Sequence, residues 1–312
     1  MALGPTLGAA ISTWAGWRWI FLANLPFCLL IAIAIPRLVA EMREPADKPI
    51  HWPSVVILTM ALGSVIEAFL LARESPLYMV LGLAMAAALF ALFTKLQRHQ
   101  TKPMFDPAVF ASRAMTAAAI LLVAVSVSYW ALLVYLPPFF ALAFGWTNEE
   151  AGIGLLILTL PMLVLPPIAA RLTPRLGWRR LFGTALASMA CGAALLMAAS
   201  LAGDRSLAMA LALVGMTAIG AGAACAHPQL SGVVVALMPA EAAGMASALT
   251  VVARQGGFAI GVAVLGAAIA LEPTSSGFAG VFAIAAAASA LGAAACALIP
   301  RNAESVGRIS EA

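Results

Sequence analysis

The chain has 312 residues, of which 63% are hydrophobic and 10% are charged, and its formal net charge is +4. An ordinary soluble domain has about 25% charged residues, so this composition excludes a soluble enzyme, a disordered chain and a fibrous protein. The basic residues lie in short loops between apolar runs, as membrane topology signals do, and this distribution argues against nucleic acid as a partner. What remains is a polytopic membrane protein whose main contact is the lipid bilayer.

Ten apolar runs follow one another along the chain. A helix needs about 20 apolar residues to cross the hydrocarbon core. The runs are continuous rather than alternating, which excludes membrane-spanning strands. The predicted spans, in chain order, are 1-16, 20-36, 53-72, 76-94, 114-140, 150-170, 181-201, 206-228, 244-271 and 277-299. The sequence therefore predicts an all-α fold with about ten transmembrane helices.

Lysine and arginine are distributed unequally between the two sides of the membrane. If the odd-numbered spans run outward, only Arg18, Arg73 and Arg205 of the 17 Lys and Arg lie outside. Positively charged loops stay in the cytoplasm. We therefore predict a multi-pass protein of the cell membrane (the inner or plasma membrane), with both termini in the cytoplasm.

The first predicted span starts at Met1, with no tail before it. No basic segment precedes the apolar run, so the run does not resemble a signal peptide. A natural protein rarely begins inside a membrane helix. We therefore expect that the chain lacks the beginning of its N-terminal region.

No residue pattern in the chain indicates an enzyme. Cys28, Cys191, Cys225 and Cys296 lie far apart inside apolar runs, which predicts packed thiols rather than a disulfide framework or a metal site. The sequence contains no P-loop, no nucleophile elbow and no zinc-hydrolase motif. We predict no catalytic residue, no metal and no cofactor.

Three stretches together resemble the major facilitator superfamily, in its fourteen-helix branch of drug:proton antiporters. The first, residues 4–8 followed by 16–26, resembles the antiporter motif on the fifth helix and the loop after it. Residues 171–180 resemble the second-half copy of the family's basic loop. Residues 244–261 are similar to the thirteenth helix. The resemblance covers essentially the whole chain, from helix five to the C-terminus, and implies that the first four helices are absent.

The resemblance also implies a division of the chain into segments. These are a two-helix remnant of the N-terminal half (1-36), a cytoplasmic linker (37-52), two linker transmembrane helices (53-94), a cytoplasmic loop (95-113), a six-helix C-terminal half (114-300) and a cytoplasmic tail (301-312).

The function that the resemblance implies is multidrug efflux. The family exchanges protons for amphiphilic drugs or other small molecules by alternating access. The alternative is a non-transporting fragment or a half-transporter that needs a separate N-terminal partner, and expressed alone the chain is then not expected to export drugs.

Small residues mark two predicted helix faces. Gly4 and Gly8 form a small-xxx-small face, on which two helix backbones can approach closely, and Pro5 is expected to bend the helix. Gly257 and Gly261 form a second face of this kind. Each face is either a seal that opens as the halves move or plain tight packing.

Residues 171–180 carry four arginines on a predicted cytoplasmic loop. The loop residues are Arg171, Arg175, Gly177, Arg179 and Arg180. One interpretation is that the charges only keep the loop in the cytoplasm. The other is a latch, in which the guanidinium groups bind helix C-termini or carboxylates. Pro174 stands where the family has an acidic residue, which weakens the second interpretation.

Few ionisable residues lie inside the predicted spans. Arg254, followed by Gln255, is either a buried charge on a gating or substrate pathway or a side chain that reaches the membrane interface. Glu67 is the acidic residue inside a span and therefore the candidate for proton handling, with an interfacial role as the alternative. His227 is either part of a proton relay or a hydrogen-bonded histidine near a helix end.

Aromatic residues and prolines mark the spans 114-140 and 150-170. Tyr129, Trp130 and Tyr135 are candidates for lining a substrate cavity, in which aromatic rings stack on an aromatic or cationic drug, with lipid-facing or packed positions as the alternative. Adjacent residues on a helix face different directions, so Tyr129 and Trp130 cannot both face the same cavity. Pro161 indicates a broken helix of the kind found at transporter substrate sites, or a simple kink.

Overall fold

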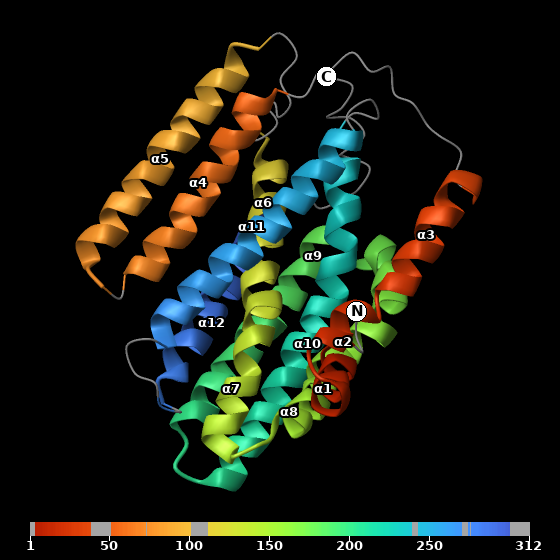
Figure 1. The fold of residues 1–312 in the computed structure, drawn as a ribbon, viewed down its shortest axis with the longest axis vertical. Coiled ribbons are helices and arrows are strands. Elements are labelled where there is room, and N and C mark those ends of the chain that lie inside the picture. The colour runs from red at the N-terminus through yellow and green to blue at the C-terminus, as the bar shows by residue number, and fades with distance from the viewer. Residues whose placement is uncertain are drawn as a thin grey trace.

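The computed structural model describes residues 4–38, 51–72, 74–100, 112–238, 243–269, 274 and 276–299, and these are helical almost throughout (Figure 1). The elements are α1 (Gly4–Ala15), α2 (Arg18–Leu22), α3 (Leu25–Leu38), α4 (Trp52–Leu71), α5 (Pro76–Arg98), α6 (Arg113–Val125), the π-helix η2 (Ser126–Ala131), α7 (Leu132–Phe144), α8 (Asn148–Thr159), α9 (Pro161–Leu201), α10 (Arg205–Ala236), α11 (Ala243–Ile269), α12 (Phe278–Ala295) and the 3-10 helix η4 (Cys296–Leu298). No strand occurs in these ranges. The predicted all-α class is confirmed.

Eight helical stretches of the described residues are long and apolar enough to cross a membrane, where the sequence predicts about ten spans. Two predicted spans, 150-170 and 181-201, lie in one stretch, Asn148–Leu201, whose two arms meet at a non-helical Gly177. The described part of the predicted span 1-16 is α1, whose 12 residues begin at Gly4, the first residue that the structure describes. That this run crosses the membrane stays a prediction.

The core of the molecule lies among α6 to α12. The helix α9 packs mainly against α10 and α12. Phenylalanine rings from the last turns of α7 and the first turns of α12 meet within it, where the ring centroids of Phe139 and Phe282 lie 5.0 Å apart at 87°. This edge-to-face arrangement is one that aromatic pairs prefer. The bundle is thus joined by close helix packing and one aromatic cluster.

The helices α4 and α5 form a hairpin beside α11, on the left of Figure 1. A Cβ on Gly82 of α5 would lie 2.7 Å from Cβ of Ala68 on α4, so the two helices approach at backbone distance. The helix α3, by contrast, has no buried residue. The hairpin corresponds to the two predicted linker helices, and the division of the chain into segments stays a prediction.

Polar residues fix where two of the core helices begin. Thr147 and Glu150 form a reciprocal capping box at the start of α8, in which the Thr147 hydroxyl accepts from the Glu150 N–H and the Glu150 carboxylate accepts from the Thr147 N–H. The Asp204 carboxylate accepts from the Leu207 N–H at 2.7 Å and caps α10. Such caps satisfy backbone donors that the helix leaves free. These acidic residues therefore have a structural role at helix ends.

The turn at Gly177 gives a stability prediction. Its φ of 75° and ψ of 157° are accessible essentially only to glycine. Gly177→Ala is expected to destabilise the protein by about 1–3 kcal/mol, measured as a lower thermal unfolding midpoint in detergent. Gly183→Ala is the matched control, because Gly183 is helical and a Cβ there meets nothing within 4 Å. Equal midpoints for the two variants would show that the turn is not strained.

Candidate functional site

A π-helical segment interrupts the helix that runs from Arg113 to Phe144. Its residues, Ser126–Ala131, widen one turn between α6 and α7. The Ser126 hydroxyl donates to the Leu122 carbonyl and the Ser128 hydroxyl to the Ala285 carbonyl on α12, both at 2.8 Å. Segments of this kind are rare and frequent at functional sites. The apolar pattern of the sequence did not indicate this one.

The glycine face of α11 lies directly against this segment. A Cβ on Gly257 would lie 3.0 Å from Cα of Val123 and 3.1 Å from Cβ of Ser126. A Cβ on Gly261 would lie 2.8 Å from Cβ of Ala131. Only hydrogen fits in these spaces without a shift of the neighbouring helix. The small-xxx-small face is therefore a close helix contact in this structure.

This contact sets one wall of a cavity of about 150 Å³, which we call the central pocket. The pocket is lined by Trp130 of η2, His227 of α10, and Arg254, Gln255 and Phe258 of α11. The ring centroids of Trp130 and His227 lie 5.5 Å apart. Four residues that the sequence singled out thus meet in one place: Trp130, His227, Arg254 and Gln255.

Arg254 is placed well inside its helix. About 16 Å of helix, at a rise of about 1.5 Å per residue, separates it from Ala243 at the start of α11. The side chain is half-buried and lines the pocket beside His227 and Trp130. This position favours the interpretation of Arg254 as a charge inside the bundle over that of a side chain at the interface.

Two nitrogen atoms in the central pocket have no hydrogen-bond partner. They are Nε1 of Trp130 and Nε2 of His227, both buried, and neither finds an acceptor or donor among the described residues. Buried polar groups are nearly always paired, so exceptions call for an explanation. His227 was predicted either to relay protons or to be hydrogen-bonded near a helix end. Among the described residues, its Nε2 atom makes no hydrogen bond.

The other aromatic candidates pack rather than line this pocket. Tyr129 is only 2% exposed and meets the Trp130 ring edge-on, with centroids 5.1 Å apart. The Tyr135 hydroxyl donates to the Val262 carbonyl at 2.5 Å and so joins α7 to α11. Pro161 is the first residue of α9, and α8 ends two residues before it, where the sequence predicts a broken or kinked helix. None of the three lines the central pocket.

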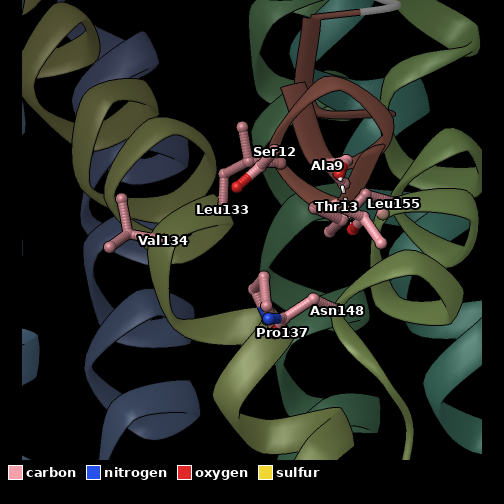
Figure 2. A pocket seen from close by; sticks show the side chains of 9 residues that line it. Ala9, Ser12, Thr13, Leu133, Val134, Pro137, Asn148 and Leu155 are labelled. Carbon is pink, nitrogen blue, oxygen red and sulfur yellow. Dashed lines mark hydrogen bonds between the residues drawn. The ribbon is translucent and has the colours of Figure 1, made fainter. Parts of the chain in front are cut away.

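A second cavity, the outer cleft, lies between α1 and the core (Figure 2). It has about 360 Å³ and is lined by Ala9, Ser12 and Thr13 of α1, Leu133, Val134 and Pro137 of α7, and Asn148, Gly152 and Leu155 of α8. Beside it, the Thr6 hydroxyl donates to the Gly152 carbonyl at 2.8 Å. One polar contact thus ties α1 to α8 next to an open space.

The predicted close packing at Gly4 and Gly8 stays a prediction. Among the described residues, a Cβ on either glycine would meet nothing within 4 Å, so this face of α1 is open there. The contact of α1 with α8 uses Thr6 instead. The predicted bend at Pro5 stays a prediction, because the residues before Gly4 lie outside the described part of the chain.

The basic loop is a tight turn between the two arms of α9. Arg171, Arg175 and Arg180 are exposed and Arg179 is half-buried, with Gly177 at the turn. The exposed arginines fit a role in keeping the turn out of the membrane, and the latch stays a prediction. Glu67 is exposed on α4 and lines neither the central pocket nor the outer cleft.

Sequence reasoning missed two features of the central pocket. The π-helix leaves no signal in hydrophobic periodicity. Phe258, however, lies four residues after Arg254, and residues at this spacing share a helix face. That spacing is the signal that would have placed Phe258 beside Arg254.

The glycine contact yields a second stability prediction. Gly261→Ala is expected to destabilise the protein by about 1–3 kcal/mol, as overpacked cores do, because its Cβ would lie 3.1 Å from the Val127 backbone. Gly256→Ala is the control, since its Cβ would lie 3.5 Å from a Leu62 methyl, an ordinary contact. Thermal unfolding in detergent compares the two variants. A Gly261→Ala protein as stable as the control would exclude the close contact.

Comparison with known proteins places this fold in a family. Residues 1–261 and 118–312, two overlapping stretches, match the sequence profile of the Major Facilitator Superfamily. Multidrug resistance protein Stp of Mycobacterium tuberculosis is 28% identical over 270 residues, which are 86% of this chain and 49% of that protein. The tetracenomycin C resistance and export protein of Streptomyces glaucescens is 29% identical over 280 residues, 86% of this chain and 50% of the relative.

Multidrug efflux pump LfrA of Mycolicibacterium smegmatis is 26% identical over 271 residues, 85% of this chain and 52% of that pump. The chain thus spans about half the length of these curated relatives. The family match covers the whole chain, and the described residues form a helical bundle with apolar helices of membrane-spanning length. The chain is a multi-pass membrane protein and belongs to the Major Facilitator Superfamily.

Proposed function

We propose that this chain is part of an efflux transporter that exports amphiphilic small molecules in exchange for protons. The observation that carries the proposal is its similarity, over 86% of its length, to a multidrug resistance protein and to an export protein of the same superfamily. The central pocket gives this proposal a place in the molecule, because it lies between three helical elements and combines aromatic with polar groups. Ligand pockets have this composition.

Alternating access assigns a role to the outer cleft. The helices α1 and α8 pack against each other, and the hydrogen bond from Thr6 to Gly152 lies beside an open cavity. In alternating access, contacts of this kind form and break as one group of helices moves against another. In this proposal the outer cleft marks the outward seal, and the arginines of the α9 turn, Arg171 to Arg180, lie on the cytoplasmic side with both chain termini.

Proton coupling is the finer part of the proposal. It rests on the resemblance of residues 4–8 to an antiporter motif. Among the described residues, Glu67 is the carboxylate inside a predicted span, on α4. Coupling requires an ionisable group that meets both sides in turn. Glu67 is exposed and distant in sequence from the pocket residues, so we propose it for proton handling only together with groups outside the described residues.

A half-unit that acts with a separate N-terminal partner is the second candidate. Two observations favour it. Gly4 and Gly8 leave an open small-residue face on α1, and α3 has no buried residue. Small-residue faces allow another helix to pack closely in a membrane. In this candidate a second chain covers α1 and α3.

One efflux experiment tests both candidates. Cells without their own drug exporters express this chain alone, the N-terminal half of Stp alone, or both chains together. In each case the accumulation of cationic, neutral and carboxylate-bearing amphiphiles inside the cells is measured. In cells that express an active transporter, we expect the compound to accumulate less than in cells without it. A protonophore is expected to raise accumulation back to the level of cells without the transporter. A fluorescent reporter that matures only in the cytoplasm, fused after Ala312, is expected to light up in the same cells.

Each outcome of the efflux experiment decides one point. Protonophore-sensitive export by the chain alone supports the transporter and contradicts the need for a partner. Export only with both chains supports the half-unit. No export of any compound, with both chains present in the membrane by immunoblot, contradicts the efflux proposal, and a dark reporter contradicts the cytoplasmic C-terminus.

A further inference from the structure

Hydrogen-bond donors converge on the central pocket from three elements. Nε1 of Trp130 on η2 is buried and unpaired, and an indole N–H can only donate. Nε2 of His227 on α10 is buried and unpaired as well, and it donates in one of the two neutral tautomers. Arg254 on α11 adds a guanidinium group, which only donates. Among the described residues that line the pocket, donors thus outnumber acceptors, since Gln255 alone adds a side-chain amide oxygen to these N–H groups.

Among the described residues, none with an acidic side chain lines the pocket beside Arg254. The described acidic residues between 112 and 299 are Glu149, Glu150 and Asp204, and all three lie at the starts of α8 and α10. On the neighbouring α4, Glu67 is exposed and lines no wall of the pocket. A charge inside a membrane bundle is costly and is normally paired. The pocket therefore carries a positive charge that a ligand can neutralise.

Three ligand classes can be compared against these groups. A cation would stack on Trp130 but would be repelled by Arg254. A neutral apolar group would leave both buried nitrogen atoms unpaired, which is unfavourable. A carboxylate accepts from several donors at once, and the planar guanidinium fork matches it in geometry. The donor set favours the carboxylate.

The size of the pocket limits what enters it. Its volume of about 150 Å³ is below the range of about 300–1,000 Å³ that holds a drug-sized ligand. One functional group therefore fits, with the rest of the molecule outside. Phe258 on the same wall provides an apolar surface for the carbon skeleton next to that group.

We propose that the pocket formed by Trp130, His227 and Arg254 binds the carboxylate of an amphiphilic small molecule. The acid binds Arg254 through its two oxygens and accepts from the Trp130 indole N–H, and His227 donates from Nε2. The physiological meaning of this site rests on the proposed export function, but the binding itself does not. The site makes carboxylate-bearing compounds the preferred substrate class of the transporter.

Binding to the purified 312-residue protein in lipid nanodiscs tests this proposal. Fluorine NMR follows para-fluorobenzoate and its uncharged isostere para-fluorobenzamide. Because hydrogen bonds to charged groups are about twice as strong as neutral ones, we expect benzoate to bind at least about tenfold more tightly than the amide. Equal affinity for the two compounds would overturn the proposal.

Four variants locate the binding. Arg254→Gln is expected to lower benzoate affinity to the level of the amide, and Arg254→Lys to restore part of it. Arg205→Gln is the matched control, because it removes the same charge near the Phe144 carbonyl at the other end of the bundle. Trp130→Phe keeps the ring and removes the N–H, and a lower benzoate affinity is expected.

The variants also keep the proposal testable if one of them does not fold. Thermal unfolding checks each protein, and Trp130→Phe decides the question should Arg254→Gln be unstable. Unchanged benzoate affinity in a folded Arg254→Gln or Trp130→Phe protein would overturn the proposal. Benzoate binding without any drug export would contradict the proposed function alone. Export without preference for benzoate over the amide would contradict this inference alone.

Discussion

The close approach of α11 to the π-helical segment is the contact on which the candidate site depends. Gly257 and Gly261 allow the α11 backbone to lie against Val123, Ser126 and Ala131 with no side chain between them. In a bilayer, lipid tails are as apolar as the helix surfaces, so close packing of this kind drives helix association. The same contact brings Arg254 and Phe258 opposite Trp130 and thereby forms the central pocket.

A fixed charge and two unpaired nitrogen atoms then give the pocket its chemical character. Apolar contacts join the bundle around it, as in the edge-to-face pair of Phe139 and Phe282. The polar groups at the pocket are different, because the buried nitrogen atoms of Trp130 and His227 find no partner among the described residues and Arg254 adds a charge beside them. Groups that cost stability without an internal partner are expected where a protein binds a ligand.

The helical class and most of the element types could be predicted from the sequence, because continuous apolar runs between basic loops have one structural solution in a membrane. The π-helix could not, since apolar composition does not indicate which carbonyl a backbone N–H selects. Trp130 and Arg254 were recognised as candidates from their residue types. Their meeting with His227 depends on tertiary packing, which no local pattern encodes. The small-xxx-small motif does not by itself indicate packing, because Gly257 lies against a neighbouring helix while Gly4 has no neighbour within 4 Å among the described residues.

Disulfide cross-linking tests the contact of α11 with the π-helix most directly. In a variant without the four native cysteines, Gly257→Cys is paired with Ser126→Cys, whose Cβ atoms would lie 3.1 Å apart, near the usual disulfide value of about 3.8 Å. Trypsin then cuts at exposed arginines such as Arg175 between the two positions. We expect the fragments to stay joined after oxidation and to separate on reduction, while Gly256→Cys paired with Ser126→Cys stays uncross-linked. Fragments that separate without reduction in the Gly257 pair, or equal cross-linking of both pairs, would contradict the contact.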